Sequence, residues 1–182
     1  MKTRNQTALI TASILFAAAG AAQADHHMVP SAVAVPDGNV VMMNTLAMGL
    51  ITYECMEKKD APGAYAWTFK IPHAYLFDTN NNQVGRYYGS PKGATWESND
   101  GSKVIGKQLA VTPNAHTVGS IPLQLVQQNG YEGNGAMNKV TYIQRLATAG
   151  GVAPANKVCN APNAGKKEIV TYQAEYILWM AK

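Results

Sequence analysis

The amino-acid sequence predicts an all-β, single-domain fold, an antiparallel β-sandwich or barrel with one disulfide. Helical periodicity is almost absent from the 182 residues. Short runs rich in β-branched and aromatic residues instead recur at intervals of roughly 10–20 residues. Clusters of Asn, Asp, Gly and Pro separate these runs. Short strands alternating with turns in this way are typical of sandwiches and barrels rather than of folds built on helices.

Eight strands are expected, because each run carries the β-branched and aromatic side chains that suit a pleated, half-buried surface. Within 140–145 and within 170–175, even-numbered and odd-numbered side chains are expected on opposite faces of the sheet. Residues 41–48 fit either a short helix or an initial strand. In chain order the expected strands span residues 49–55, 64–70, 74–77, 83–88, 103–111, 121–127, 139–146 and 169–179.

The turns between these strands are marked by their residue types. Asn and Asp fill residues 78–82, the strongest hairpin signal in the chain, because Asx side chains bond nearby backbone amides and tolerate left-handed geometry. Further turns are expected at residues 91–93, 99–101, 129–130 and 133–135, where Gly stands beside Pro, Asn or Asp. No internal repeat or domain linker interrupts this pattern.

The first 24 residues have the pattern of a signal peptide. Lys2 and Arg4 precede an apolar run at 8–19, and Ala22 and Ala24 are the small residues that a signal peptidase recognises. The run is too short to span a bilayer comfortably, and the alternative of a retained anchor lacks a stop-transfer pattern. We therefore expect export to the periplasm or the extracellular space. The mature chain would be a single β-rich domain, residues 25–182, with a flexible segment at about 25–38 and no transmembrane segment.

The composition argues against nucleic-acid binding. The chain has 15 Lys and Arg against 11 Asp and Glu, and loss of the leader would remove Lys2 and Arg4 from the basic set. No stripe of basic residues interleaved with aromatic ones is present. We expect no nucleic acid among the partners.

The two cysteines, Cys55 and Cys159, are expected to form a disulfide. An even cysteine count in a chain bound for an oxidising compartment favours a bridge, although a free catalytic thiol is the alternative. The bridge would pin a loop rich in Gly, Ala, Pro and Asn to a strand. That loop has few side chains with which to pack itself.

The segment at 87–104 (YYGSPKGATWESNDGSKV) is the least generic part of the chain, with its Trp-Glu-x-x-Asp-Gly-Ser motif. Together with the Val-Thr-Tyr-Ile-Gln-Arg motif at 140–145 and the runs at 66–70, 76–78 and 150–154, it resembles a family of small secreted proteins. The family occurs in bacteria and filamentous fungi and is known only as a domain of unknown function. The resemblance extends from about Gly49 to Trp179 and includes both cysteines. It implies export, a mostly β fold and no established activity.

Two carboxylates in this segment, Glu97 and Asp100, are candidates for a catalytic pair. A glycosidase needs two carboxyl groups across a sugar, one of them with a raised pKa. Trp96, His73 and Arg86 would be neighbours in such a cleft. The competing interpretation is structural: the Asp100 side chain would cap backbone amides in a turn whose next residue, a glycine, takes a positive φ.

Cleavage after Ala24 would create a candidate metal site from Asp25, His26 and His27. The free α-amine, two deprotonated amide nitrogens and the His27 imidazole can surround a metal in one plane, which favours Cu(II) or Ni(II) over Zn(II). The competing interpretation is an ordinary disordered terminus.

The planar arrangement predicts that the neighbouring residues His26 and His27 contribute differently to Cu(II) binding. His27→Ala should abolish the visible d–d absorption of bound Cu(II), because the imidazole is lost. His26→Ala should leave the absorption largely intact, because His26 supplies only its backbone nitrogen. Equal losses in the two variants would contradict the planar site and favour one formed by both imidazoles.

These observations favour a non-catalytic binding or envelope-associated protein. Its partner would be an unknown small molecule, a glycan or an envelope component. The alternative function is a carbohydrate-active hydrolase that uses Glu97 and Asp100.

Overall fold

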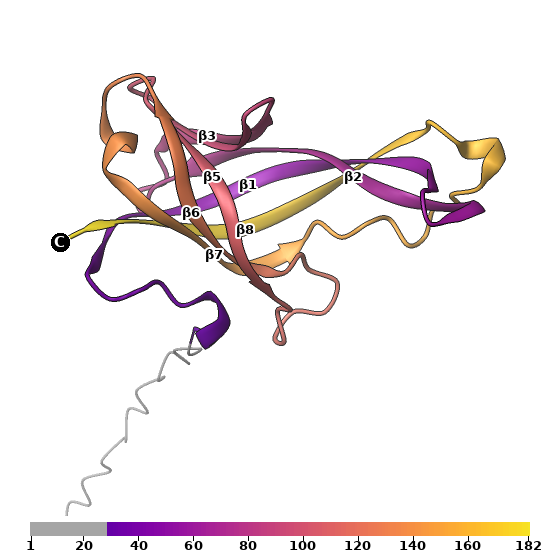
Figure 1. Ribbon diagram of the computed structural model, residues 1–182, viewed down its shortest axis with the longest axis horizontal. Helices are drawn as coiled ribbons and strands as arrows, with labels where there is room; N and C mark the ends of the chain where they lie inside the picture. Colours follow the sequence, from indigo (N-terminus) through magenta and orange to yellow (C-terminus); the bar gives the residue numbers. More distant parts are fainter. Residues whose placement is uncertain (1–28) are drawn as a thin grey trace, which may run out of the picture.

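The structure, a computed structural model, describes residues 29–182 (Figure 1). The predicted signal peptide and the candidate metal residues Asp25, His26 and His27 lie outside the described residues. In the described part, the only helical elements are three short 3-10 turns, η1 (Ser31–Val33), η2 (Ala136–Lys139) and η3 (Ala161–Asn163). The strands are β1 (Asn39–Lys58), β2 (Ala61–Phe77), β3 (Gln83–Ser90), β4 (Gly93–Ser98), β5 (Lys103–Thr112), β6 (Leu123–Glu132), β7 (Val140–Gly150) and β8 (Lys167–Ala181).

The eight strands form one antiparallel sheet that closes into a ring. Each strand pairs with the next along the chain, and β1 also pairs with β8. Ala47 of β1, for example, lies opposite Leu76 of β2 on one side and Ala174 of β8 on the other. The all-β, antiparallel prediction is confirmed.

Three strands continue beyond the ring. Strands β1, β2 and β8 extend together to one end of the molecule, where the loop at 151–166 lies against the β1–β2 hairpin (Figure 1). The predicted disulfide is confirmed there: Cys55 of β1 is bonded to Cys159 of this loop, with a Cα–Cα distance of 5.4 Å. Trp67 of β2 also holds the loop, because its indole Nε1 donates to the carbonyl of Lys157 at 3.0 Å.

The interior of the ring is packed with aromatic and aliphatic side chains. Tyr87, Trp96 and Tyr176 form an aromatic cluster from three different strands, with ring centroids 4.6–5.5 Å apart. Trp96 and Tyr176 are fully buried.

Two predicted strands are one strand in the structure, and one observed strand was not predicted. The runs at 64–70 and 74–77 belong to β2, although Pro72 lies between them. Strand β3 pairs with β2 only from His73 onward, so Pro72 lies where that edge of β2 has no strand partner and its missing N–H costs little. Strand β4 was not predicted because it has six residues between two turns.

The undecided segment at 41–48 is part of β1, which makes β1 the longest strand. The predicted turn at 78–82 joins β2 to β3. Its geometry rests on Asp78, whose Oδ1 accepts the amides of Asn80 at 2.9 Å and Asn82 at 2.8 Å. Asn81 takes the left-handed conformation, with φ of 62°.

The expected alternation holds in β8 but breaks in β7. An irregularity between Val140 and Tyr142 places Val140 and Ile143 in the same core, so even-numbered residues of β7 do not share one face. Gln144 lies on the opposite face, where its Nε2 donates to the carbonyl of Val33 at 2.6 Å. Val33, in η1, is itself fully buried.

Candidate functional site

The five predicted cleft residues are divided between the two faces of the sheet. Trp96 lies opposite Tyr87 in β3 and Val104 in β5, and all three side chains are buried in the core. Arg86 and Glu97 face each other one position along, on the outer face. Trp96 therefore packs inside the ring and does not share a surface with the ionic pair.

Arg86 and Glu97 form an ion pair on the outer face. The Arg86 guanidinium donates to both carboxylate oxygens of Glu97, with distances of 2.9–3.1 Å, and the hydroxyl of Tyr88 donates to the same carboxylate at 2.6 Å. These hydrogen bonds, those from Arg86 above all, hold the pKa of Glu97 below its usual value. A carboxylate held in this way is a poor proton donor at neutral pH.

Asp100 belongs to a separate network that supports a turn. Its Oδ1 accepts the amide of Ser102 at 2.9 Å and the hydroxyl of Ser102 at 2.6 Å, and its Oδ2 accepts the amide of Ala136 at 2.8 Å. Gly101 has a φ of 84°, as the turn interpretation requires. The amide of Ala136, followed by the Ser102 groups, lowers the pKa of Asp100 to about 2.

The lowered pKa of Asp100 predicts an acid-dependent contribution to stability. A group with a depressed pKa in the folded state stabilises it above the unfolded value near 4, and this contribution is lost as the pH falls toward about 2. Asp100→Asn should therefore have a lower melting temperature than the wild type at pH 5. The difference between the two melting temperatures should become smaller as the pH falls from about 4 toward about 2.

The measurement is a series of melting curves from about pH 5 down to the acid limit. Asp60→Asn is the control, because the structure gives the Asp60 side chain no hydrogen bond within the described chain. A constant difference between Asp100→Asn and the wild type across the window would contradict the capping role.

His73 is also on the outer face, on β2. Its ring packs edge-on against Tyr75 with centroids 5.3 Å apart, and it lies opposite Tyr88 of β3. The structure thus brings Arg86, Glu97 and His73 to neighbouring strands of one face. Trp96 lies on the other face, and Asp100 makes its contacts in the turn beyond β4.

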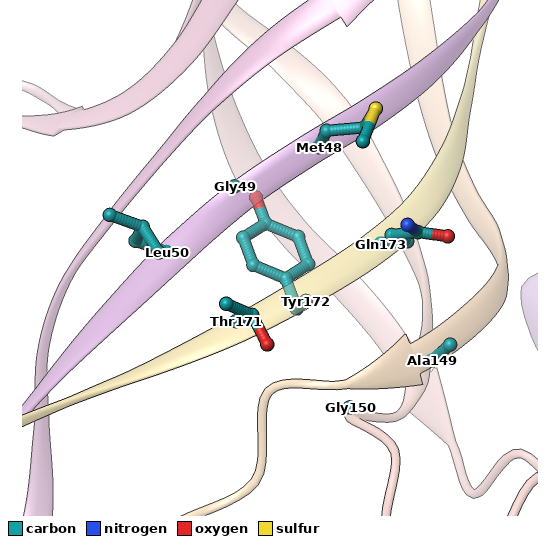
Figure 2. Close-up of a pocket in the computed structure, with 8 residues that line it drawn as sticks. All are labelled: Met48, Gly49, Leu50, Ala149, Gly150, Thr171, Tyr172 and Gln173. Carbon is teal, nitrogen blue, oxygen red and sulfur yellow. The ribbon is translucent and has the colours of Figure 1, made fainter.

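A groove of about 700 Å³ lies on β1, β7 and β8. Figure 2 shows the Tyr172 ring reaching from β8 toward Gly49 of β1, with Met48, Leu50, Thr171 and Gln173 around it. Met48 and Leu50 are each 45 % exposed, and no charged side chain lines the groove. The groove is lined by Met48, Gly49, Leu50, Ala149, Gly150, Thr171, Tyr172 and Gln173.

A second hollow, of about 320 Å³, has the lining expected of a ligand site. Most of its lining residues are aliphatic, aromatic or proline, and three polar side chains, two glutamines and an arginine, line it with them. Ligand pockets typically combine these two features in volumes upward of about 300 Å³. We call it the tyrosine pocket; it is lined by Ile51, Tyr53, Phe69, Pro72, Tyr87, Gln108, Ile121, Pro122, Gln124, Arg145 and Tyr172.

Arg145 supplies the only charge in the lining of this pocket. It comes from β7 and is half-buried, and its Nε donates to the carbonyl of Pro122 at 3.0 Å. Among residues 29–182, no carboxylate forms an ion pair with it. Its charge acts on the phenols of four tyrosines, in each of which it opposes the rise in pKa that burial causes: Tyr53, Tyr87, Tyr172 and Tyr176.

The tyrosine hydroxyls beside Arg145 are neutral donors. Tyr53 donates to the carbonyl of Gly151 at 2.8 Å. The hydroxyls of Tyr172 and Tyr176 are buried and make no hydrogen bond of normal geometry within the described chain. Burial raises the pKa of Tyr87, Tyr172 and Tyr176 well above the ordinary value, so these phenols stay protonated at neutral pH.

Sequence reasoning did not identify this pocket. It interpreted the alternating tyrosines as core and cross-strand pairs and assigned Arg145 no role. A signal was present, because Arg145 shares a strand face with the buried Ile143, and an arginine in a core-facing position needs a partner. What the sequence does not contain is the position of β1, β3 and β8 around that arginine.

Residues 29–182 contain neither a membrane-spanning helix nor a cluster of metal ligands. No helix there has both the length and the apolar character needed to cross a membrane. Nor does that part of the chain gather three His, Cys, Asp or Glu side chains into a group that could hold a metal ion.

Comparison with known proteins identifies a family but no characterised relative. No curated protein matches the chain. No solved structure matches it either. The family model described as "Protein of unknown function (DUF3455)" matches residues 36–180, which is most of the chain and includes all the strands of the ring except the last residue of β8. The chain therefore belongs to this family of proteins of unknown function.

Proposed function

We propose that this protein is an exported, non-catalytic binding protein that takes a small molecule into the tyrosine pocket. The observation that carries the proposal is the lining of that pocket, in which aromatic and aliphatic walls surround an arginine with no acidic partner. Apolar walls give a ligand its affinity, and a few fixed polar groups give it its orientation.

Export is supported by the leader-like sequence at 1–24 and by the disulfide. A bridge such as Cys55–Cys159 persists in oxidising compartments and is rare in the cytosol. The periplasm and the extracellular space both meet this condition.

Binding is favoured over catalysis by what the pocket lacks. None of its lining residues is a Ser, Cys, His, Asp or Glu. Burial keeps the phenols of Tyr87 and Tyr172 protonated at neutral pH, which makes them poor bases and nucleophiles. The alternative of a carbohydrate-active hydrolase has weaker support, because Glu97 and Asp100 are held as carboxylates by separate sets of hydrogen bonds.

Copper binding is a separate proposal that concerns Asp25, His26 and His27. It depends on the mature amino terminus rather than on the pocket. The comparison of His27→Ala with His26→Ala tests it independently.

The pocket proposal predicts a specific loss of binding when an aromatic wall is removed. Phe69 lines the pocket, is 51 % exposed and packs edge-on against Tyr53, with centroids 6.1 Å apart. Phe69→Ala should weaken ligand binding by about tenfold, because a stacked or edge-on aromatic contact is lost. The ligand is first found by screening small aromatic and aliphatic molecules against the exported protein by thermal shift and tyrosine fluorescence.

The matched control is Tyr75→Ala. Tyr75 is on the same strand and is 47 % exposed, but it does not line the tyrosine pocket. The Tyr75→Ala variant should bind the ligand with the same affinity as the wild type. If no molecule in the screen binds, or if both variants weaken binding equally, the tyrosine pocket is not the binding site.

A further inference from the structure

We infer that the ligand of the tyrosine pocket is a small carboxylate with an aromatic or apolar body, bound through its carboxylate to Arg145. The inference rests on the proposed binding function and adds the chemical class of the ligand. It depends on three features of the pocket: the unpaired arginine, the neutral phenols and the apolar walls.

The two arginines of the described chain have opposite environments. Arg86 is on the outer face, where Glu97 neutralises it through paired hydrogen bonds. Arg145 lines the pocket, and its hydrogen bond to Pro122 goes to a neutral carbonyl. The charge of Arg145 therefore has no compensating anion within residues 29–182.

A half-buried guanidinium keeps part of its hydration, and an anionic ligand would add the counter-charge that residues 29–182 do not supply. Desolvation of a charged group costs free energy, and an ion pair with hydrogen bonds is the usual compensation. The Nε of Arg145 donates to the carbonyl of Pro122, which holds the guanidinium in place, and the guanidinium also interacts with the buried phenol of Tyr176; both partners are neutral. Guanidinium groups bind planar carboxylates through two parallel hydrogen bonds, so a carboxylate is the anion best suited to pair with Arg145.

The tyrosines around Arg145 favour an acceptor as well. Tyr172 lines the pocket, and its hydroxyl makes no hydrogen bond of normal geometry within the described chain. An anionic ligand offers lone pairs to such a donor, whereas a cation offers none. The pocket also contains no carboxylate that would repel an anion.

The lining and the volume of the pocket indicate what the rest of the ligand, beyond its carboxylate, is like. Ile51, Phe69 and Ile121 surround the remaining space, which suits a ring or a short hydrocarbon chain better than a hydroxylated sugar. A volume of about 320 Å³ is at the small end for ligand pockets, so the body is expected to be a single ring or its equivalent. A bare inorganic anion would not fill these walls.

The test compares a carboxylate with its neutral isostere. Cinnamate and cinnamamide have the same planar body and differ in charge, and inorganic phosphate serves as the bare anion. Binding to the exported protein is measured by calorimetry and by ligand-observed NMR. We expect cinnamate to bind at least tenfold more tightly than cinnamamide, because charge-assisted hydrogen bonds are the stronger kind, and phosphate to bind more weakly than cinnamate.

Two substitutions at Arg145 and one control locate the effect. Arg145→Gln removes the charge and should abolish the preference for the acid. Arg145→Lys keeps the charge but loses the paired geometry, so the preference should fall to an intermediate value. Arg86→Gln removes the other arginine of the described chain and should leave the preference unchanged. Circular dichroism and an intact disulfide establish that each variant is folded.

The outcomes test the carboxylate assignment separately from the proposal that the tyrosine pocket binds a small molecule. If acid and amide bind equally well and Phe69→Ala weakens both, the pocket binds small molecules and the carboxylate assignment is wrong. If the preference survives in Arg145→Gln or disappears in Arg86→Gln, the anion binds elsewhere and the assignment is also wrong. If neither compound binds, the assignment is wrong for aromatic carboxylates of this size, whereas the wider screen decides the binding proposal.

Discussion

Replacing Cys55 and Cys159 by serine should lower the free energy of unfolding by about 4–5 kcal/mol, the value that loop-closure entropy gives for a bridge across roughly 100 residues. The two cysteines are 104 residues apart in sequence. For a domain of this size the melting temperature should fall by roughly 10–20 °C. Thermal and denaturant unfolding of the double variant and the oxidised wild type measure the difference.

The loss of stability in the double variant should be greatest where the disulfide joins the loop at 151–166 to β1. Without the bridge, the loop is held there by Trp67 and by two backbone hydrogen bonds of Cys55, whose N–H donates to Lys166 and whose carbonyl accepts from Gly165. Val158→Ser is the control, because Val158 precedes Cys159, is 67 % exposed and should change little. An unfolding midpoint unchanged in the double variant would show that the bridge adds nothing to stability.

Trp96→Ala should cost about 3–5 kcal/mol of stability, the usual price of emptying a large aromatic site in a core. Trp96 is fully buried against Tyr87 and Tyr176. The packing around it is tight, since a Cβ on Gly106 would lie 2.7 Å from the indole. Unfolding in denaturant measures the loss, and near-ultraviolet circular dichroism reports on the aromatic cluster.

Trp96→Phe provides the matched comparison, because it keeps a ring in the core and should cost clearly less than Trp96→Ala. The result also distinguishes two roles for this residue. Had Trp96 stacked on a ligand at the surface, its removal would impair binding and spare stability. Stability unchanged in Trp96→Ala would therefore contradict the core assignment.

The sequence predicted the strands well where side-chain pattern determines structure. In β8, Tyr172 and Ala174 are buried while the alternating residues Thr171 and Gln173 are exposed, as the alternation required. In β7 the same reasoning was wrong, because a shift of pairing beside Val140 changes which residues face inward. Such irregularities arise from pairing with a distant strand, which a local pattern does not contain.

The site was harder to predict than the fold for the same reason. The neighbours Trp96 and Glu97 suggested one cleft, yet adjacent strand residues face opposite sides of a sheet. Arg145 and Tyr53 are far apart in sequence and meet only because the ring brings β1 and β7 to one hollow. The turn at Asp100, by contrast, has a local cause in the hydrogen bonds from Ser102 and could be anticipated from the sequence, whereas the bond from Ala136 could not.

Closure of the ring by its first and last strands has a consequence for the timing of folding. Asn39 at the start of β1 pairs with Ala181 at the end of β8, so the circle of hydrogen bonds is incomplete until almost the whole polypeptide has been synthesised. Pairings between such distant segments form slowly. The pairings between consecutive strands need only neighbouring segments, so closure of the ring by β1 and β8 is expected to be a late step, after the hairpins have formed.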